Sequence, residues 1–115
     1  MANTFKVVTK ANVTSADVIY TVAGSTTTVL LGILLGNTTG SAITATVSLG
    51  SDTANRAGNN DEANQTVELI TGTSIPANSS LELLTGNKVV METTDTLSVT
   101  GSASTDVVLS IMEIT

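Results

Sequence analysis

The 115-residue chain is acidic, with a formal net charge of −6, and it contains neither cysteine nor histidine. The lack of cysteine excludes disulfides and thiolate metal sites within the chain, and the lack of histidine removes the commonest general base and metal ligand. Only four residues are cationic, whereas binding along a phosphate backbone requires several clustered cations, so we expect no nucleic-acid binding.

Length and hydrophobic content predict one domain over residues 1–115 with a core of its own. Because Phe5 and Tyr20 are the only aromatic residues, Val, Leu and Ile must fill that core, and such residues suit β-sheets. The first residues lack the basic and apolar regions of a signal peptide. The longest apolar run, Val29–Gly36, is far shorter than the ~20 residues that span a bilayer, so we expect no membrane segment.

Two short strands are predicted near the start of the chain from their period-two alternation. The first covers Thr4–Thr9. The second covers Asp17–Val22 and places Val18, Tyr20 and Val22 on one side.

A third predicted strand, Thr27–Asn37, is apolar on both faces, with the odd positions from Val29 to Leu35 on one of them. Such a pattern is typical of a central strand that is covered on both sides. Turn residues at 37–41 then predict a hairpin into a fourth strand, Ile43–Leu49, which alternates apolar and hydroxyl side chains.

The polar segment Gly50–Asn64 has no aliphatic residue larger than alanine. We interpret it as a loop insertion that contacts a neighbouring protein, because long loops are often functional and arginine suits bidentate contacts with carboxylates. Oxygen-rich loops can also hold Ca²⁺, but the spacing matches no EF-hand, so we favour a solvated loop without metal. The candidate interface residues in this loop are Arg56, Asn59, Asn60 and Asp61.

The second half of the chain contains five further predicted strands and a turn region at 72–80 around its single proline. Nine short strands with turn residues between them predict an all-β fold, an antiparallel β-sandwich of jelly-roll-like or immunoglobulin-like type with about eight or nine strands. The five strands are Gln65–Ile70, Leu81–Leu84, Lys88–Met91, Thr96–Thr100 and Asp106–Ile114.

The last of these strands has two apolar faces. The odd positions from 107 to 111 form one face, and Val108, Met112 and Ile114 form most of the other. Either both faces are buried inside the domain, or the second face meets another subunit. We favour burial within the domain, and we keep Val108, Met112 and Ile114 as candidate interface residues.

No catalytic set emerges from the sequence. The carboxylates stand singly at predicted strand edges or outer faces, and the many serines and threonines have no histidine to activate them. We therefore expect no enzymatic activity, no catalytic or metal-binding residue and no cofactor. The carboxylates considered are Asp17, Glu68, Glu82, Glu92, Asp95 and Asp106.

Six segments of the chain are distinctive when taken together: Val18–Val22, Ala23–Ile33, Asn37–Thr39, Ile75–Leu81, Gly86–Val90 and Leu109–Thr115. With these segments the chain resembles small β-rich virion proteins of tailed bacteriophages, above all those of phages that infect cyanobacteria and marine bacteria. In such proteins we expect glycine at the positions of Asn78 and Thr94.

The resemblance implies a structural component of the virion, assembled in the host cytoplasm. The favoured role is a capsid decoration or cement protein that binds the major capsid protein as a homo-oligomer, for example a trimer. The alternative is a tail, collar or fibre-attachment protein that binds other virion proteins. A receptor- or carbohydrate-binding module is a third possibility, disfavoured because aromatic rings for stacking are scarce.

Overall fold

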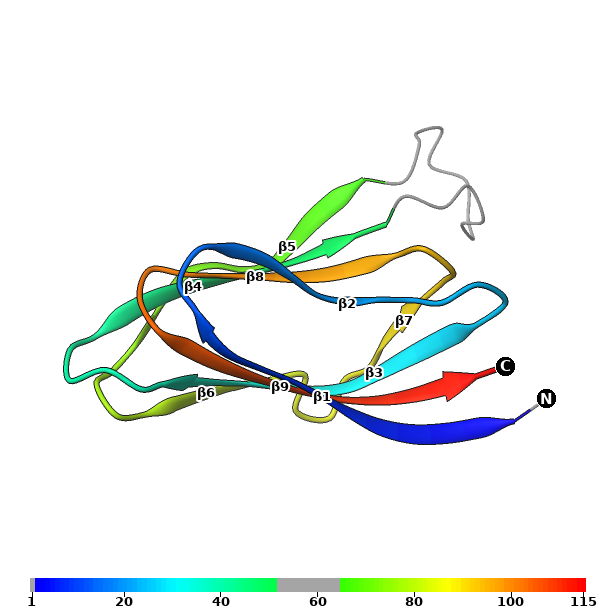
Figure 1. The fold of residues 1–115 in the computed structure, drawn as a ribbon, viewed down its shortest axis with the longest axis horizontal. Helices are drawn as coiled ribbons and strands as arrows, with labels where there is room; N and C mark the ends of the chain where they lie inside the picture. Colours follow the sequence, from blue (N-terminus) through cyan, green and yellow to red (C-terminus); the bar gives the residue numbers. More distant parts are fainter. Residues whose placement is uncertain (1, 52–64) are drawn as a thin grey trace.

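The computed structural model describes residues 2–51 and 65–115, which form nine β-strands and no helix (Figure 1). Accordingly, no helix that could cross a membrane occurs in the described residues. The strands are β1 (Asn3–Val13), β2 (Ala16–Thr21), β3 (Thr27–Asn37), β4 (Ile43–Gly50), β5 (Thr66–Ile75), β6 (Ser80–Leu83), β7 (Val89–Met91), β8 (Thr96–Gly101) and β9 (Thr105–Ile114).

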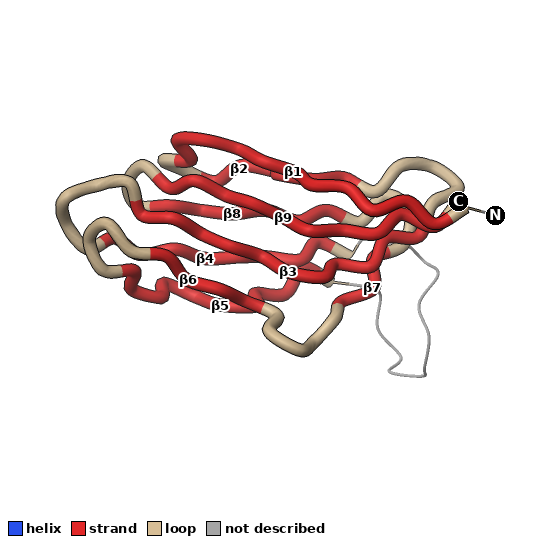
Figure 2. The backbone as a smooth tube through the Cα atoms, turned by 90° about the horizontal axis from the view of Figure 1, so that it is seen from below, coloured by secondary structure: helices blue, strands red, loops and turns tan. Residues whose placement is uncertain are grey.

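The strands form two antiparallel sheets that pack face to face. The five-stranded sheet has the order β1-β9-β3-β6. Its fifth strand, β7, pairs with the first part of β3, whereas β6 pairs with the second part. The four-stranded sheet has the order β2-β8-β4-β5. Figure 2 shows β1, β9 and β3 running side by side across one face of the molecule. The prediction of an all-β antiparallel sandwich is confirmed.

The core lies between the sheets and is almost entirely aliphatic. Leu30, Leu35 and Leu109 from the five-stranded sheet are fully buried against Val47 and Leu97 from the four-stranded sheet. These strands form because alternate positions supply branched apolar side chains to one face, which removes them from water.

The predicted hairpin between β3 and β4 is wrong, because these strands lie in different sheets. Asn37 turns the chain at this corner. Its buried side-chain amide donates to the carbonyl oxygens of Ser41 at 2.8 Å, Ile75 at 3.0 Å and Pro76 at 3.0 Å. Its side-chain oxygen accepts from the backbone N–H of Thr39 at 2.8 Å. These bonds satisfy polar groups that the crossover would otherwise leave unpaired.

Two β-bulges change which residues face inward. A bulge between Leu30 and Gly32 adds one residue to β3, so the buried positions switch from even to odd along the strand. A second bulge separates Val18 from Tyr20 in β2, so Val18 is exposed while Tyr20 is half-buried. The predictions of one continuous odd-numbered face in β3, and of Val18 beside Tyr20, are therefore wrong.

β5 is longer than predicted, because it continues through the expected turn region to Ile75. Gly72 adopts a left-handed backbone with φ of 54°, and its N–H donates to the Thr46 hydroxyl at 2.9 Å. Pairing with β4 resumes at Thr73, so glycine accommodates an irregularity inside the strand instead of ending it.

Candidate functional site

The residues predicted to form an interface fall into two groups. Arg56, Asn59, Asn60 and Asp61 lie outside the described residues, as does the loop proposed as an alternative Ca²⁺ site. Val108, Met112 and Ile114 lie on β9, where they are half-buried and not buried.

The second apolar face of β9 points away from the core. Val107, Leu109 and Ile111 are buried between the sheets, so the alternate positions Val108 and Met112 must point outward. The favoured expectation, burial of both faces within the domain, is wrong. The reason is that the described residues form only two layers, and β9 is central within its sheet without being sandwiched on both faces.

Neighbouring strands extend this surface into an apolar patch that we call the outer face. Residues directly opposite each other in antiparallel strands point to the same side, so the register defines its rows. Phe5 and Val7 on the edge strand β1 are the most exposed apolar side chains of the patch, at 72% and 65%. The three central rows are Phe5–Met112–Val29–Val90, Val7–Ser110–Gly32 and Thr9–Val108–Leu34.

A groove of about 340 Å³ lies in the outer face over β3 and the segment that follows β6. Gly32 and Ser110, which pair with each other, supply no large side chain at its centre. Glu82 contributes a carboxylate to the lining. The apolar side chains among the lining residues include Leu31, Leu34, Leu84 and Val108.

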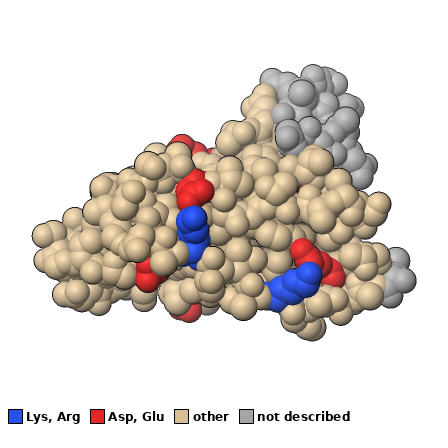
Figure 3. Space-filling view, viewed as in Figure 1, with Lys and Arg blue, Asp and Glu red and all other residues tan. Residues whose placement is uncertain are grey.

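Few charges interrupt the surface of the molecule. In Figure 3 the acidic and basic side chains form small groups separated by wide uncharged areas. Lys6 and Lys10 of β1 belong to the core-facing side of that strand and pair with Glu113 at 2.6 Å and Asp17 at 3.6 Å. The outer face therefore has no lysine from β1, although β1 contains two of the four cations of the chain.

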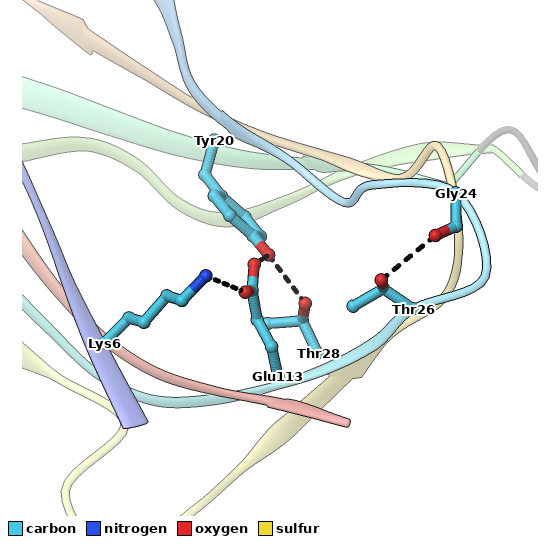
Figure 4. A network of polar contacts seen from close by, with 6 residues as sticks. All are labelled: Lys6, Tyr20, Gly24, Thr26, Thr28 and Glu113. Carbon is cyan, nitrogen blue, oxygen red and sulfur yellow. Dashed lines mark hydrogen bonds and ion pairs between the residues drawn. The ribbon is translucent and has the colours of Figure 1, made fainter. Parts of the chain in front are cut away.

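A polar network joins the two sheets beside the core (Figure 4). The Tyr20 hydroxyl of β2 donates to Glu113 Oε2 of β9 at 2.5 Å and lies 2.7 Å from the Thr28 hydroxyl of β3. The Lys6 ammonium contacts the other carboxylate oxygen of Glu113 at 2.6 Å. The carboxylate thus connects β1, β2 and β9, and the Tyr20 hydroxyl adds β3.

The protonation states of this network are held in place by its contacts. Burial, followed by the hydrogen bond to Glu113, raises the pKa of Tyr20 to about 12. The contacts of Lys6 and Tyr20 lower the pKa of Glu113 below its ordinary value. A tyrosine with a raised pKa and a carboxylate with a lowered pKa are poor proton-transfer groups at pH 7. The network is therefore suited to connecting the sheets. The sequence analysis did not predict this network. The feature that could have indicated it is Glu113, a charged residue on the otherwise apolar inner face of β9.

One of the six carboxylates considered as candidates lies in a different environment from the one predicted. Asp95 was expected at a strand edge or outer face, but it is buried at 3% exposure, which corrects that expectation. Its Oδ2 accepts the backbone N–H of Glu92 at 3.0 Å and closes the turn before β8. Within residues 2–51 and 65–115, no three acidic residues lie close enough together to hold a metal ion.

Comparisons with known proteins identify a fold relative but no family. No family model matches the chain, and no curated protein matches it. A solved structure of Bacillus endospore appendages, which form a family of disulfide-linked pili, is similar with a TM-score of 0.51. The alignment covers 99% of this chain and 87% of that chain at 17% sequence identity, which shows a shared fold.

Proposed function

We propose that this chain is a non-enzymatic structural subunit of a bacteriophage virion, and that its favoured role is decoration of the major capsid protein. The observation that carries the proposal is the outer face, where Phe5, Val7 and the half-buried Met112 form an apolar surface on a stable sheet. Contiguous exposed apolar patches mark interaction sites. A subunit that works by burying surface against other proteins requires such a patch and needs no catalytic group.

The composition supports a role in assembly over an enzymatic role and over a role in binding carbohydrate. The described residues hold no cluster of metal-ligating side chains, and the chain lacks histidine and cysteine. A carbohydrate-binding module would present aromatic rings for stacking, but Phe5 is the only strongly exposed ring in the described residues.

A tail or fibre subunit of the virion is the second candidate, and the fold similarity to the pilus protein favours it. The pili of that relative are disulfide-linked, whereas the 115 residues of this chain contain no cysteine. A fibre built from this chain would therefore be held together by noncovalent contacts between apolar surfaces.

Quantitative mass spectrometry of purified particles of the encoding phage tests the proposal. A copy number comparable to that of the major capsid protein supports decoration of the shell. A copy number of a few tens or fewer favours the tail or fibre role, since tails contain far fewer subunits. Absence of the chain from particles that are otherwise complete would overturn both.

A further inference from the structure

We infer that the outer face of the five-stranded sheet binds a second copy of this chain, with Phe5 of each copy inserted into the groove around Gly32 of the other. The inference rests on the proposed function, because it names the partner of the surface that carries that proposal. It follows from the shape, charge and area of the face.

The face contains both halves of a reciprocal contact. Phe5 is a projecting ring at one edge, 72% exposed on β1. The groove near the opposite edge has a volume of about 340 Å³, and its walls combine the apolar Leu34 and Val108 with the polar Thr85 and Glu82. A cavity of about 150 Å³ lined by apolar side chains already holds benzene, so the groove accommodates a phenyl ring.

The strand order brings these two features together in a symmetric dimer. A two-fold axis in the plane of the face, placed between β9 and β3, carries β1 of one copy over the β6 and β7 side of the other. Phe5 lies in the row of Val90, one row away from Gly32, so the axis must be inclined to the strands for Phe5 to reach the groove over β3 and the segment after β6. The same operation repeats the contact on the other side, as an isologous interface requires.

Glu82 is the one charged residue in the three central rows of the outer face, and it is exposed at the β6 end of the row through Val108. The other two rows, through Met112 and Ser110, contain only apolar side chains, serine and glycine, so they can be removed from water without burying a charge. Pairing along the free edge of β1 would instead enclose Lys6 and Lys10, and inward-pointing charges of this kind protect edge strands. Contact through the face is therefore favoured over addition of a strand at the edge.

The available area is sufficient for a weak, specific dimer. Four strands spaced about 4.8 Å apart, over a length of eight or nine residues at about 3.4 Å each, give a face of roughly 550 Å². Two such faces in contact bury roughly 1,100 Å², slightly above the ~1,000 Å² that separates specific interfaces from incidental ones. An interface at this lower limit of size is expected to associate weakly.

Sedimentation velocity of the isolated chain over a range of concentrations up to about 1 mM, the weak end of specific association, tests the inference. Wild-type protein should shift from monomer to dimer. Phe5→Asp removes the ring, and Gly32→Arg fills the groove. A Cβ at Gly32 meets no atom within 4 Å, so the second change leaves the fold intact. Each should weaken dimerisation at least about 30-fold, as loss of an interface hot spot does.

Val18→Asp is the matched control, because Val18 is an exposed apolar residue on the edge strand of the other sheet. It should dimerise like the wild type. Circular dichroism confirms that all three variants are folded.

An equimolar mixture of the Phe5→Asp and Gly32→Arg proteins gives the sharpest result. In the mixed dimer one contact is fully wild-type, and in the other the introduced carboxylate meets the introduced guanidinium. Only a reciprocal contact between Phe5 and the groove predicts that the mixture dimerises better than either protein alone.

A wild-type chain that stays monomeric, an oligomer insensitive to both variants, or a mixture that does not recover would each overturn the inference. A monomeric chain that is nevertheless abundant in particles leaves the proposed function standing with another partner at this face. A dimer that is absent from particles overturns the proposed function alone.

Discussion

Tyr20 illustrates how one side chain joins two sheets. Its ring comes from β2, and its hydroxyl contacts Glu113 and Thr28, which belong to β9 and β3 of the other sheet. Each hydrogen bond is worth little in isolation, but a buried hydroxyl without partners would cost about 1–3 kcal/mol. The network therefore also selects the relative position of the sheets.

The titration of Tyr20 is the first prediction at this scale. Its pKa should be about 12 in the folded protein, against 10.0 when unfolded. Because folding raises this pKa, the neutral hydroxyl contributes stability that is complete below pH 10 and is lost as the pH rises towards 12. Tyr20 is the only tyrosine, so tyrosinate absorbance reports it without overlap. A midpoint near 10 while circular dichroism still shows folded protein would contradict the network.

Backbone strain at Thr94 gives a second prediction. Thr94 has a φ of 73°, in the left-handed region that β-branched residues avoid, at a position where the resemblance to phage proteins implies glycine. The free energy of unfolding should be about 1 kcal/mol higher for Thr94→Gly than for Thr94→Ala, because both changes remove the side chain and only glycine adopts this φ without strain. The backbone N–H at this position keeps the bond to the Val22 carbonyl.

Urea denaturation measures the difference between Thr94→Gly and Thr94→Ala. The same two changes at Thr100 are the control, because Thr100 is exposed within β8 and glycine there should be about 0.5–1 kcal/mol less stable than alanine. Equal stability of the two Thr94 variants would show that the left-handed φ carries no cost.

At the scale of elements, the corner between β3 and β4 decides the topology. Five residues separate the strands, and turn chemistry at 37–41 fits a hairpin equally well. What directs β4 to the other sheet is the Asn37 amide, which binds the carbonyls of Ile75 and Pro76 from the distant end of β5. The corner thus links two connections that are far apart in the sequence.

The third prediction concerns this corner. Asn37→Ala should lower the free energy of unfolding by roughly 2–3 kcal/mol, because it leaves the buried Ile75 carbonyl and the Thr39 N–H without their partner. Ser41→Ala is the matched control, because Ser41 is exposed at the same corner and contributes its backbone, not its hydroxyl, to the hydrogen bonds there, so the change should cost at most about 0.5 kcal/mol. Thermal or urea denaturation distinguishes them. A loss equal to that of the control would rule out a structural role for the amide.

At the scale of the whole molecule, the two sheets share one core. Buried residues such as Leu35 and Leu109 on one sheet belong to the same apolar core as Val47 and Leu97 on the other. Neither sheet alone can remove its apolar face from water, so the two sheets should unfold together.

The fourth prediction is a single cooperative transition. Far-UV circular dichroism reports all strands, whereas Tyr20 fluorescence reports the junction between the sheets, and the two should give the same midpoint. Measurement at low protein concentration avoids a contribution from self-association. Separate midpoints would show that one sheet survives without the other.

Local patterns in the sequence were sufficient to predict the strands and much of the core. Alternation of apolar and hydroxyl side chains predicts a strand wherever one face is buried, and Val47 and Leu97 face the core as their alternation indicates. Strand formation is a local property, because the period of two repeats within each segment. The exclusions that follow from missing cysteine and histidine are equally independent of the fold.

The pairing of the strands, and the apolar faces that stay uncovered, depend on contacts that form only in the folded chain. The bulge before Gly32, the crossing at Asn37 and the contact of Tyr20 with Glu113 each depend on residues distant in sequence. The second face of β9 is apolar whether an internal layer or another subunit covers it, so its sequence cannot distinguish the two. The layering of the sandwich distinguishes them, because the number of sheets fixes which side of a central strand is exposed.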